Sequence, residues 1–519
     1  MVAELPAKLH SGTTARLVAA GALALAVFGL IGRLLSYPLN RDENLFISVA
    51  SELGSGDLYR DLGYNHLPNL AYLLGGIFAL TGDGHFLLVG RLVILAGWLF
   101  ALLGLWLVSR RLELDGLAYC AGAFLLVGNF LLLGEPGMLV SNNFLPIPCV
   151  FLAFCCLLGA LANGRRAPLE AFLAGLLASV TIGLKANFII LAPAFFLATL
   201  LAPAAIPLAE RVRMAAVPLA FGGFVGGLPA LAHFAYDPDG FLAHTLRYFT
   251  ELQAAYWQGV DEPKNVALSK KVLLAERVSF AGTNILAISA ICLLGALGIS
   301  REGTGFLKDW RIVLLTALSA GGFVIAFLPT PSFAQYFVPL VPFLILLFMV
   351  LAARLERSGP SFVQALCVSL CALGLLVALP RLGSGAIQLA SADDWETLEI
   401  GPNIARLGDR AGLEQGALVA TLTPVMALEA GYSIYPEFTA GQFVYRVAPF
   451  IKEEDRQYYR TTSPEQLRAF LDNNPPDAIL VNREEPIESQ LAAYAIARGF
   501  EAYGSSRIAD GVDLYVAPE

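Results

Sequence analysis

The feature that most constrains this chain is a series of long apolar runs separated by short polar segments. In an α-helix, about 20 apolar residues at 1.5 Å each cross the roughly 30 Å hydrocarbon core of a membrane. By this measure the sequence predicts about eleven spanning helices, near residues 17–36, 86–108, 115–133, 144–162, 168–184, 187–203, 214–235, 279–299, 312–329, 336–353 and 361–380. The composition agrees, because 57% of the residues are hydrophobic and only 15% are charged. We therefore predict a polytopic α-helical membrane protein.

Charge and cysteine placement exclude other classes. A net charge of −8 offers no basic surface for nucleic acid. All seven cysteines lie inside apolar runs, so we expect neither a disulfide nor a cysteine metal site. The first apolar run, 17–36, is longer than the core of a signal peptide and lacks a small-residue cleavage site, which predicts a retained membrane anchor.

Basic residues in the loops predict the orientation. The run 67–82 is short and contains Pro68 and Asn69. If it does not cross the membrane, the later basic loops all fall on the side of Lys8 and Arg16, namely those with Arg110/Arg111, Arg165/Arg166, Arg211/Arg213, Arg301/Lys308/Arg311 and Arg354/Arg357. Loops rich in Lys and Arg are cytoplasmic. We therefore interpret 67–82 as an interfacial or re-entrant helix and place the N-terminus in the cytoplasm.

This orientation collects the polar chemistry on the outer face. The outer segments are 40–69, 134–143, 236–277, 329–335 and everything after residue 381. Residues 386–519 alternate short apolar runs such as 417–422 and 478–481 with helical patterns at 464–471 and 487–498, which predicts a small soluble α/β domain. We expect it to follow a transmembrane domain at 1–385.

Two adjacent acids, Asp42 and Glu43, stand directly after the first apolar run. Apolar residues then recur at helical spacing until Gly54, which predicts a short amphipathic helix lying on the membrane. Asn40 and Glu43 have the spacing of a capping box, so the acids could serve only to begin this helix. Alternatively, a carboxylate at the lipid boundary could accept the proton of a hydroxyl that attacks a lipid-linked sugar.

A phosphate that departs in such a reaction needs positive charge beside it. Candidate cations near the outer face are Arg41, Arg60, His66, Lys185, His233, His244 and Arg247. Lys185 lies between two slightly short apolar runs, where an ionisable group is expected to have a partner. A bound phosphate would serve, and so would extension of the side chain to the membrane surface.

Several segments resemble the GT-C superfamily of membrane glycosyltransferases, in the branch of protein mannosyltransferases and aminoarabinose transferases. They are the Asp-Glu pair after the first span, the Gly-Asp-Leu-Tyr at 56–59, the Asn-His-Leu-Pro at 65–68, GDGHFLLVGR at 82–91, Gly-Leu-Lys at 183–185 and LPTPSFAQYFVPLVP at 328–342. The resemblance implies a polyprenyl-phosphate-linked sugar donor, inversion at the sugar carbon and an active site on the outer face. It implies catalytic roles for the acid pair, with Asp42 as the base by position and Glu43 beside it.

The resemblance also extends to binding residues, with departures. Where many members have a second acid this chain has Ser141, Asn142 and Asn143, with Glu135 nearby. The late segment lacks the lysine of aminoarabinose transferases, so Gln335 and Tyr336 are expected to supply the polar contacts there. Substrate contacts are expected from Arg41, Arg60, His66, Glu135, Asn142, Asn143, Lys185, His244, Arg247, Gln335 and Tyr336. No cofactor is certain; if a divalent metal is bound, His66 and Glu43 are its expected ligands.

The sequence thus predicts a glycosyltransferase of a bacterial inner membrane, with a cytoplasmic N-terminus and a periplasmic C-terminal domain. Its expected partners are membrane lipids, the lipid-linked donor and a glycan, glycolipid or protein acceptor. The alternatives are a transporter or flippase of lipid-linked sugars and a noncatalytic partner in envelope assembly. A transporter would place ionisable groups near the middle of the bilayer, whereas here the acids are concentrated in outer loops.

Overall fold

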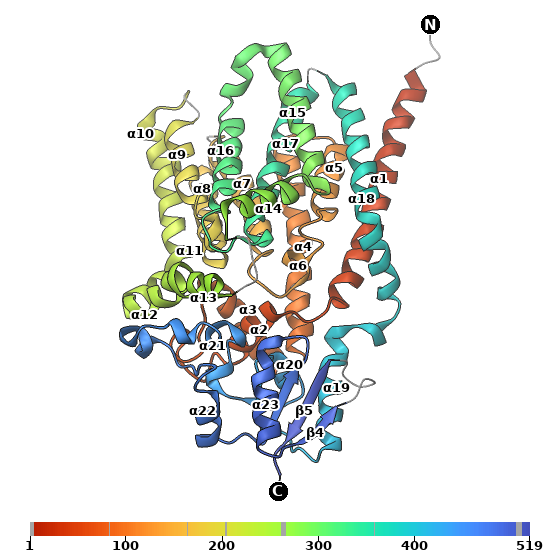
Figure 1. Cartoon of the computed structure of the whole chain (residues 1–519). Helices are drawn as coiled ribbons and strands as arrows, with labels where there is room; N and C mark the ends of the chain where they lie inside the picture. Colours follow the sequence, from red (N-terminus) through yellow and green to blue (C-terminus); the bar gives the residue numbers. More distant parts are fainter. Residues whose placement is uncertain are drawn as a thin grey trace.

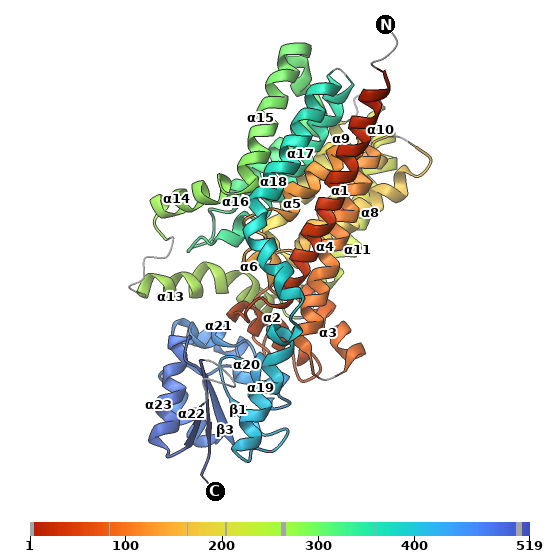
Figure 2. The ribbon, with the colours of Figure 1, turned by 90° about the vertical axis from the view of Figure 1, so that its right-hand side faces the viewer.

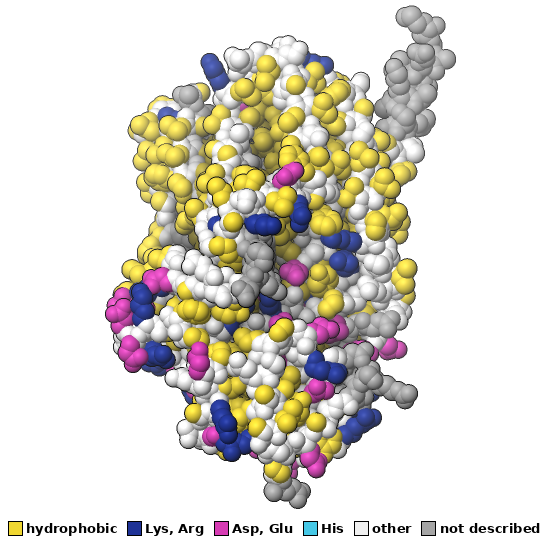
Figure 3. All heavy atoms as spheres, viewed as in Figure 1, with side chains coloured by type: hydrophobic (Ala, Val, Ile, Leu, Met, Phe, Trp, Pro, Cys, Tyr) yellow, Lys and Arg dark blue, Asp and Glu magenta, His cyan; other side chains and the backbone are white. Residues whose placement is uncertain are grey.

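A bundle of long apolar helices forms one end of the molecule and a small α/β domain forms the other (Figure 1). The computed structural model describes residues 5–82, 84–162, 164–202, 205–260, 266–357, 359–504 and 511–518. Apolar side chains cover the bundle surface, and charged side chains gather over the α/β domain and at its boundary with the bundle (Figure 3). This distribution is that of a multi-pass membrane protein with a soluble domain, as predicted.

Among the described residues, seven helical ranges are long and apolar enough to cross a membrane. They are formed by α1 (Leu5–Leu35), α4 (Phe86–Arg111), α8 (Ala167–Leu184), α10 (Leu208–Arg211) with η2 (Val212–Ala216) and α11 (Val217–Tyr236), α15 (Thr283–Glu302) with η4 (Gly303–Lys308), η5 (Ala334–Phe337) with α17 (Leu340–Glu356), and α18 (Pro360–Leu389). Shorter apolar helices complete the bundle: α5 (Gly116–Val127), α7 (Pro146–Ala160), η1 (Ala186–Phe188) with α9 (Leu191–Leu201), and α16 (Trp310–Ile325). Every range predicted to span the membrane coincides with one of these units.

Helix α3 (Asn69–Thr81) occupies the run that was predicted not to cross. Its 13 residues extend about 20 Å, which is less than the hydrocarbon thickness. It packs against α2 (Arg41–Ser51) at the boundary with the α/β domain (Figure 1). The interfacial placement of this run therefore stays a prediction that its length favours.

Ion pairs join the loops at the far end of the bundle, where α1 begins and α15 turns into α16 (Figure 1). The pairs are Arg16 with Asp115, Arg111 with Glu170, Arg354 with Glu302 and Asp309, and Arg357 with Glu113. Most of these arginines belong to the loops predicted to be cytoplasmic. The structure thus gathers these loops on one side, as the charge pattern requires.

Short helices lie between the bundle and the α/β domain: α2, α6 (Glu135–Met138), α12 (Pro238–Leu242), η3 (Ala243–Leu252), α13 (Gln253–Gly259) and α14 (Leu268–Ser279). Helices α13 and α14 project from one face of the bundle (Figure 2). Of the predicted outer segment 236–277, residues 261–265 lie outside the described residues.

The α/β domain contains a five-stranded mixed sheet with the order β2-β1-β3-β5-β4. Strands β2, β1 and β3 are parallel, and β5 pairs antiparallel with β3 and β4. The strands are β1 (Leu418–Ala420), β2 (Ser433–Ile434), β3 (Ala478–Asn482), β4 (Glu501–Gly504) and β5 (Val512–Val516). The helices are α19 (Glu396–Arg410), α20 (Pro424–Glu429), α21 (Gln442–Tyr445), α22 (Leu467–Asn473) and α23 (Ser489–Ala497), with short turns η6 (Ala392–Asp394), η7 (Pro436–Phe438), η8 (Ala448–Phe450), η9 (Glu453–Tyr458) and η10 (Pro486–Glu488). The predicted small α/β domain is confirmed.

The α/β domain is docked on the first outer segment by specific hydrogen bonds. The Val425 amide donates to Asn44 Oδ1 at 3.1 Å, and the Ser48 hydroxyl donates to the Thr439 carbonyl at 2.6 Å. The Leu87 amide at the start of α4 donates to Glu429 Oε1 at 2.6 Å. One apolar core continues from the bundle into the domain. The two domains predicted from the sequence therefore share a packed interface.

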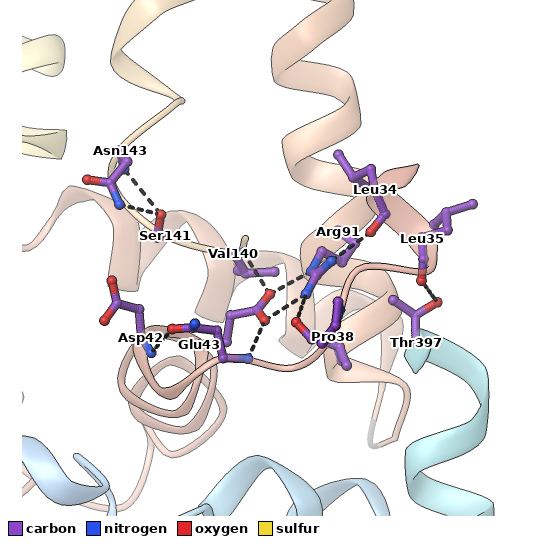
Figure 4. Close-up of polar contacts among 12 residues, drawn as sticks. Leu34, Leu35, Pro38, Asp42, Glu43, Arg91, Val140, Ser141, Asn143 and Thr397 are labelled. Atoms are coloured by element: carbon purple, nitrogen blue, oxygen red, sulfur yellow. Dashed lines mark hydrogen bonds and ion pairs between the residues drawn. The ribbon is translucent and has the colours of Figure 1, made fainter. Parts of the chain in front are cut away.

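A buried ion pair connects α2 to the bundle (Figure 4). Arg91 Nε and Nη2 donate to Glu43 Oε1 and Oε2 at 2.6 and 2.7 Å, and both side chains are fully buried. Arg91 Nη1 also donates to the Leu34 carbonyl at 2.6 Å, and the Val140 amide donates to Glu43 Oε1 at 2.8 Å. The backbone amide of Asn40 donates to Glu43 Oε2 at 3.2 Å, which completes the predicted capping box. The Arg91–Glu43 pair thus connects four segments: the end of α1, the start of α2, helix α4 and the segment before Asn142.

We predict that Arg91→Met destabilises the protein by about 3–5 kcal/mol, because removing one partner leaves a buried charge without compensation. The measurement is the midpoint of thermal unfolding of the purified protein in detergent. The matched control is Arg357→Met, because the Arg357–Glu113 pair is 78% and 76% exposed and such pairs contribute about 0–1 kcal/mol. Equal midpoints for the two variants would show that the buried pair does not anchor α2.

Candidate active site

A cavity of about 750 Å³ lies where the bundle meets the α/β domain. Its walls come from α2, the loop 65–67, the segment 142–143, the break between α8 and α9, η3 with α13, the segment 325–336, and α21 with the residue after it. These segments are far apart in the sequence. The cavity therefore exists only when the bundle and the domain are assembled.

Eight of the residues predicted to act in the site line this cavity: Arg41, Asp42, His66, Asn142, Asn143, Lys185, Gln335 and Tyr336. They come from three of the predicted outer segments (40–69, 134–143 and 329–335), from Tyr336 directly after the last of these, and from the helix break at Lys185. The structure brings together the polar groups that the orientation argument placed on one side of the membrane.

Asp42 is the carboxylate that faces the cavity among the described residues. Asp42 and Glu43 point in opposite directions from the first turn of α2, with Asp42 toward the side of Asn143 (Figure 4). Burial raises the pKa of Asp42, and the positive charges of Arg41 and Lys185 oppose that rise. A carboxylate with increased proton affinity is suited to act as a general base.

Lys185 stands at the break between α8 and η1, where its backbone is extended. Its side chain is buried, and Nζ donates to Asn143 Oδ1 at 2.6 Å. Nζ also lies 5.7 Å from the centre of the Tyr336 ring. An ammonium group has three donors. Asn143, one of the predicted polar residues, thus orients Lys185 by using one of these donors. The other donors remain for a ligand in the cavity.

His66 lines the cavity as a neutral group. Burial and, to a smaller extent, the charge of Lys185 together lower its pKa to about 3. Nδ1 lies 2.6 Å from Asn65 Oδ1, so Nδ1 is the donor and Nε2 is an acceptor. The predicted cationic role of His66 is therefore replaced by hydrogen bonding.

Glu43 lies outside the cavity, contrary to the catalytic role predicted for it. Both of its oxygens accept hydrogen bonds from Arg91, and each accepts one more from a backbone amide. An acid engaged in this way has no free position toward a substrate. The physical reason is the helical rotation between adjacent residues, which turns one acid of the pair inward to the bundle and the other to the cavity.

Four other predicted residues also lie outside the cavity lining. Glu135 Oε1 is 3.5 Å from Asn40 Nδ2, and its pKa is raised by burial and by the charge of Asp42. Arg60 is exposed and pairs with Asp61, His244 Nε2 lies 2.8 Å from the Tyr458 carbonyl, and Arg247 pairs with Asp455 at 3.0 Å. The last two contacts join the segment 236–277 to the α/β domain. Arg60, His244 and Arg247 thus contact other parts of the protein, where contacts to substrate had been predicted.

The predicted metal ligands do not form a metal site. Within the described ranges, there is no group of three or more His, Cys, Asp or Glu side chains that could hold an ion. Glu43 is engaged with Arg91, and His66 lies on the cavity side of α2. These donors do not fit a divalent metal.

Sequence reasoning missed several polar residues of the lining, among them Asn65, Tyr248, Gln253 and Arg446. Asn65 lies in a segment already noted for its motif, and Tyr248 lies in the outer segment 236–277. Arg446 ends an aromatic-rich stretch of the α/β domain. Pattern alone gives no signal that this arginine leaves its own domain and enters the cavity.

The fold is similar to that of ArnT from Cupriavidus metallidurans. The structure of ArnT bound to undecaprenyl phosphate matches with a TM-score of 0.58 and 14% identity, covering 97% of this chain and 99% of ArnT. The apo state of ArnT matches with a TM-score of 0.56 and 14% identity, covering 98% and 100% of the two chains. No protein-family model and no curated protein matches the sequence. The chain thus shares its fold with ArnT, and the predicted resemblance is confirmed at the level of fold.

We predict that acidification destabilises the protein through its buried histidines. Burial lowers the pKa of His66 to about 3 and that of His244 to about 4. The unfolded chain takes up these protons below about pH 6.5, whereas the folded chain does not, so stability falls as the pH decreases below that value. At pH 5 the loss is about 2 kcal/mol for each histidine.

The measurement is the thermal unfolding midpoint between pH 5 and pH 8. His66→Asn and His244→Asn should each flatten its dependence on pH, whatever their effect on stability at pH 8. His85→Asn is the control, because His85 is exposed and its left-handed backbone suits Asn. Parallel curves for the wild type and both buried-site variants would contradict the prediction.

Proposed function

We propose that this protein is a glycosyltransferase that moves a sugar from a polyprenyl-phosphate donor to an acceptor on the outer side of the membrane. The observation that carries the proposal is that Asp42 and the buried Lys185 line one cavity at the end of the bundle, close enough for the charge of Lys185 to lower the pKa of Asp42. The fold supports it, because ArnT with the same fold has been solved with undecaprenyl phosphate bound.

Each side chain has a distinct chemical role in this proposal. Asp42 accepts the proton of the acceptor hydroxyl as its oxygen attacks the anomeric carbon. The bond between that carbon and the phosphate oxygen breaks, and the electron pair leaves with the polyprenyl phosphate. Lys185 stabilises the negative charge that develops on this phosphate. Attack from the face opposite to the departing phosphate inverts the configuration of the sugar.

Amide and hydroxyl groups in the same cavity suit a sugar. Asn142, Asn143 and Gln335 line it and offer both donors and acceptors, and Tyr336 adds an aromatic ring and a hydroxyl. These groups would orient hydroxyls of the donor or the acceptor. We infer that the acceptor is an envelope molecule: lipid A or core, a polysaccharide or a protein.

The location follows from charge and topology. The basic loops gather at the end of the bundle opposite to the cavity, and such loops face the cytoplasm. The cavity and the α/β domain would then face the periplasm of a bacterial inner membrane. This places the reaction where lipid-linked sugars and envelope acceptors meet.

We predict that Asp42→Asn reduces sugar transfer at least 100-fold, because a general base contributes about 10²–10⁴-fold to the rate. Mass spectrometry of envelope glycolipids and glycans from cells with and without the gene defines the product. The same product is then quantified in cells that produce the variant. Binding of undecaprenyl phosphate to purified Asp42→Asn protein should stay near the wild-type level.

The matched control is Glu135→Gln, because Glu135 is close enough to Asp42 for the charge of Asp42 to raise its pKa but lies outside the cavity lining. It should retain most of the transfer activity. If Asp42→Asn supports wild-type product levels, Asp42 is not the base. If loss of the gene changes no glycolipid or glycan, the transferase proposal itself is wrong, and transport of lipid-linked sugars becomes the reading to test.

We predict that Lys185→Met weakens binding of undecaprenyl phosphate about tenfold or more, because a charged hydrogen bond contributes about 1.5–3 kcal/mol. Binding is measured on purified protein in detergent, with undecaprenol as the uncharged comparison. Arg60→Gln and Arg247→Gln are controls, since both arginines pair with acids away from the cavity lining. Equal losses in all three variants would indicate a general electrostatic effect rather than a phosphate site at Lys185.

A further inference from the structure

The α/β domain places an arginine inside the cavity. Arg446 directly follows α21 and lines the cavity with Phe443 from the same domain. Its side chain is buried, with an exposed fraction of 4% for the residue. The pattern of the sequence gave no sign that this domain supplies a charged group to the cavity.

Aromatic rings surround the guanidinium of Arg446. Its central carbon lies 4.9 Å from the ring centre of Phe443, 5.3 Å from that of Tyr256 and 5.4 Å from that of Trp257. Such rings attract a cation through their faces but supply no anion. They fix the position of the guanidinium and exclude water from around it.

The hydrogen-bond donors of Arg446 are largely unfilled. Nη1 is 3.5 Å from Gln442 Oε1, at the limit of a hydrogen bond, and the guanidinium lies beside the Tyr248 hydroxyl. Nε is buried and has no hydrogen-bond partner among the described residues. Arg446 also forms no ion pair with any described residue. Asp42 lies in the same cavity but forms no ion pair with Arg446, so this buried charge has no bonded anion, and a negatively charged ligand is expected to supply one.

Arg91 shows how this chain satisfies a buried arginine when the role is structural. Its guanidinium donates to both oxygens of Glu43 and to two backbone carbonyls. Both arginines are buried to a similar degree. The difference is that Arg446 lines an open cavity, whereas Arg91 is paired with the acid Glu43.

The charges of the cavity lining match a phosphate group. The lining contains Arg41, Lys185 and Arg446 as cations, Asp42 as an acid and a neutral His66, so three positive charges and one negative charge give +2. Both Lys185 and Arg446 lie close enough to Asp42 for their charges to lower its pKa. A phosphate monoester carries about −1.5 to −2 at pH 7.

We propose that Arg446, carried by the α/β domain, binds a phosphate group in the central cavity, so that this domain completes the site for a phosphorylated lipid substrate. This inference rests on the proposed transferase function. In that reaction the donor phosphate gains a negative charge as it leaves. A second cation therefore stabilises the departing phosphate more than it stabilises the intact donor. The phosphate belongs either to the polyprenyl donor or to a phosphorylated acceptor, and binding measurements distinguish the two sources.

The experiment compares full-length wild-type protein, Arg446→Gln and Arg446→Lys in detergent. The control is Arg468→Gln, which removes an exposed arginine of the same domain. The probes are undecaprenyl phosphate, undecaprenol, and a soluble hexose 1-phosphate added to protein already saturated with undecaprenyl phosphate. The readouts are the dissociation constant of each probe and the thermal midpoint with and without it.

If Arg446 binds the donor phosphate, Arg446→Gln weakens the binding of undecaprenyl phosphate about tenfold or more and leaves the binding of undecaprenol unchanged. If Arg446 binds a phosphate of the acceptor, Arg446→Gln binds undecaprenyl phosphate normally but no longer binds the hexose 1-phosphate. Arg446→Lys should retain part of either effect, because lysine keeps the charge but loses the paired donors. Without ligand, the midpoint of Arg446→Gln should equal or exceed that of the wild type, because an unpaired buried charge has been removed.

The inference is overturned if Arg446→Gln binds both phosphorylated probes like the wild type. It is also overturned if both Arg446 variants lose thermal stability without ligand while each keeps its ligand-induced shift, which indicates a structural role. A failure of the proposed function looks different. In that case the wild type itself does not discriminate undecaprenyl phosphate from undecaprenol, and Lys185→Met is without effect.

Discussion

The buried pair of Glu43 and Arg91 is the interaction on which the site depends. It joins α2 to α4 and, through backbone hydrogen bonds, to the end of α1 and the segment that leads to Asn142. An arginine inside an apolar helix requires a partner, and an acid at the start of α2 supplies it. Because Glu43 is held in this way, the adjacent Asp42 is fixed on the cavity side of α2. The capping box adds to this by setting the point at which α2 begins.

The cavity is assembled from both ends of the chain. The bundle supplies Asp42, Lys185 and the amide groups, while the α/β domain supplies Arg446 and Phe443. Hydrogen bonds from the domain to Asn44 and Ser48 attach it to the same helix that carries Asp42. A shift of the domain would therefore move one wall of the cavity relative to the base. His244 and Arg247 add to this attachment, because they join the segment 236–277 to the domain and do not line the cavity.

Much of the fold could be predicted because its causes are local. A run of about 20 apolar residues predicts a helix wherever it lies in the chain. The capping box at Asn40 and the break at Lys185 also depend on neighbouring residues, and the structure contains both. Loop charge further predicted that the segments carrying Asp42, His66, Asn143 and Tyr336 would lie on one side, and all four residues line the cavity.

The roles of individual charged residues could not be read in the same way. Successive residues of a helix are rotated by about 100°, so two adjacent acids face different surroundings, and the sequence does not say which surroundings are which. His66 is neutral because of burial, and burial depends on segments far away in the chain.

The sequence by itself determined the apolar helices, the side on which the polar segments gather and the position of an acid at the membrane boundary, since hydrophobicity and periodicity act over short stretches. Only the tertiary structure decided that Glu43 is an anchor, that Arg247 is paired with Asp455, and that Arg446 enters the cavity. The reason is that the pairing of a charge depends on distance in space. Contacts such as Glu43 with Arg91, or Arg446 with the rings of α13, join residues that the chain order separates widely.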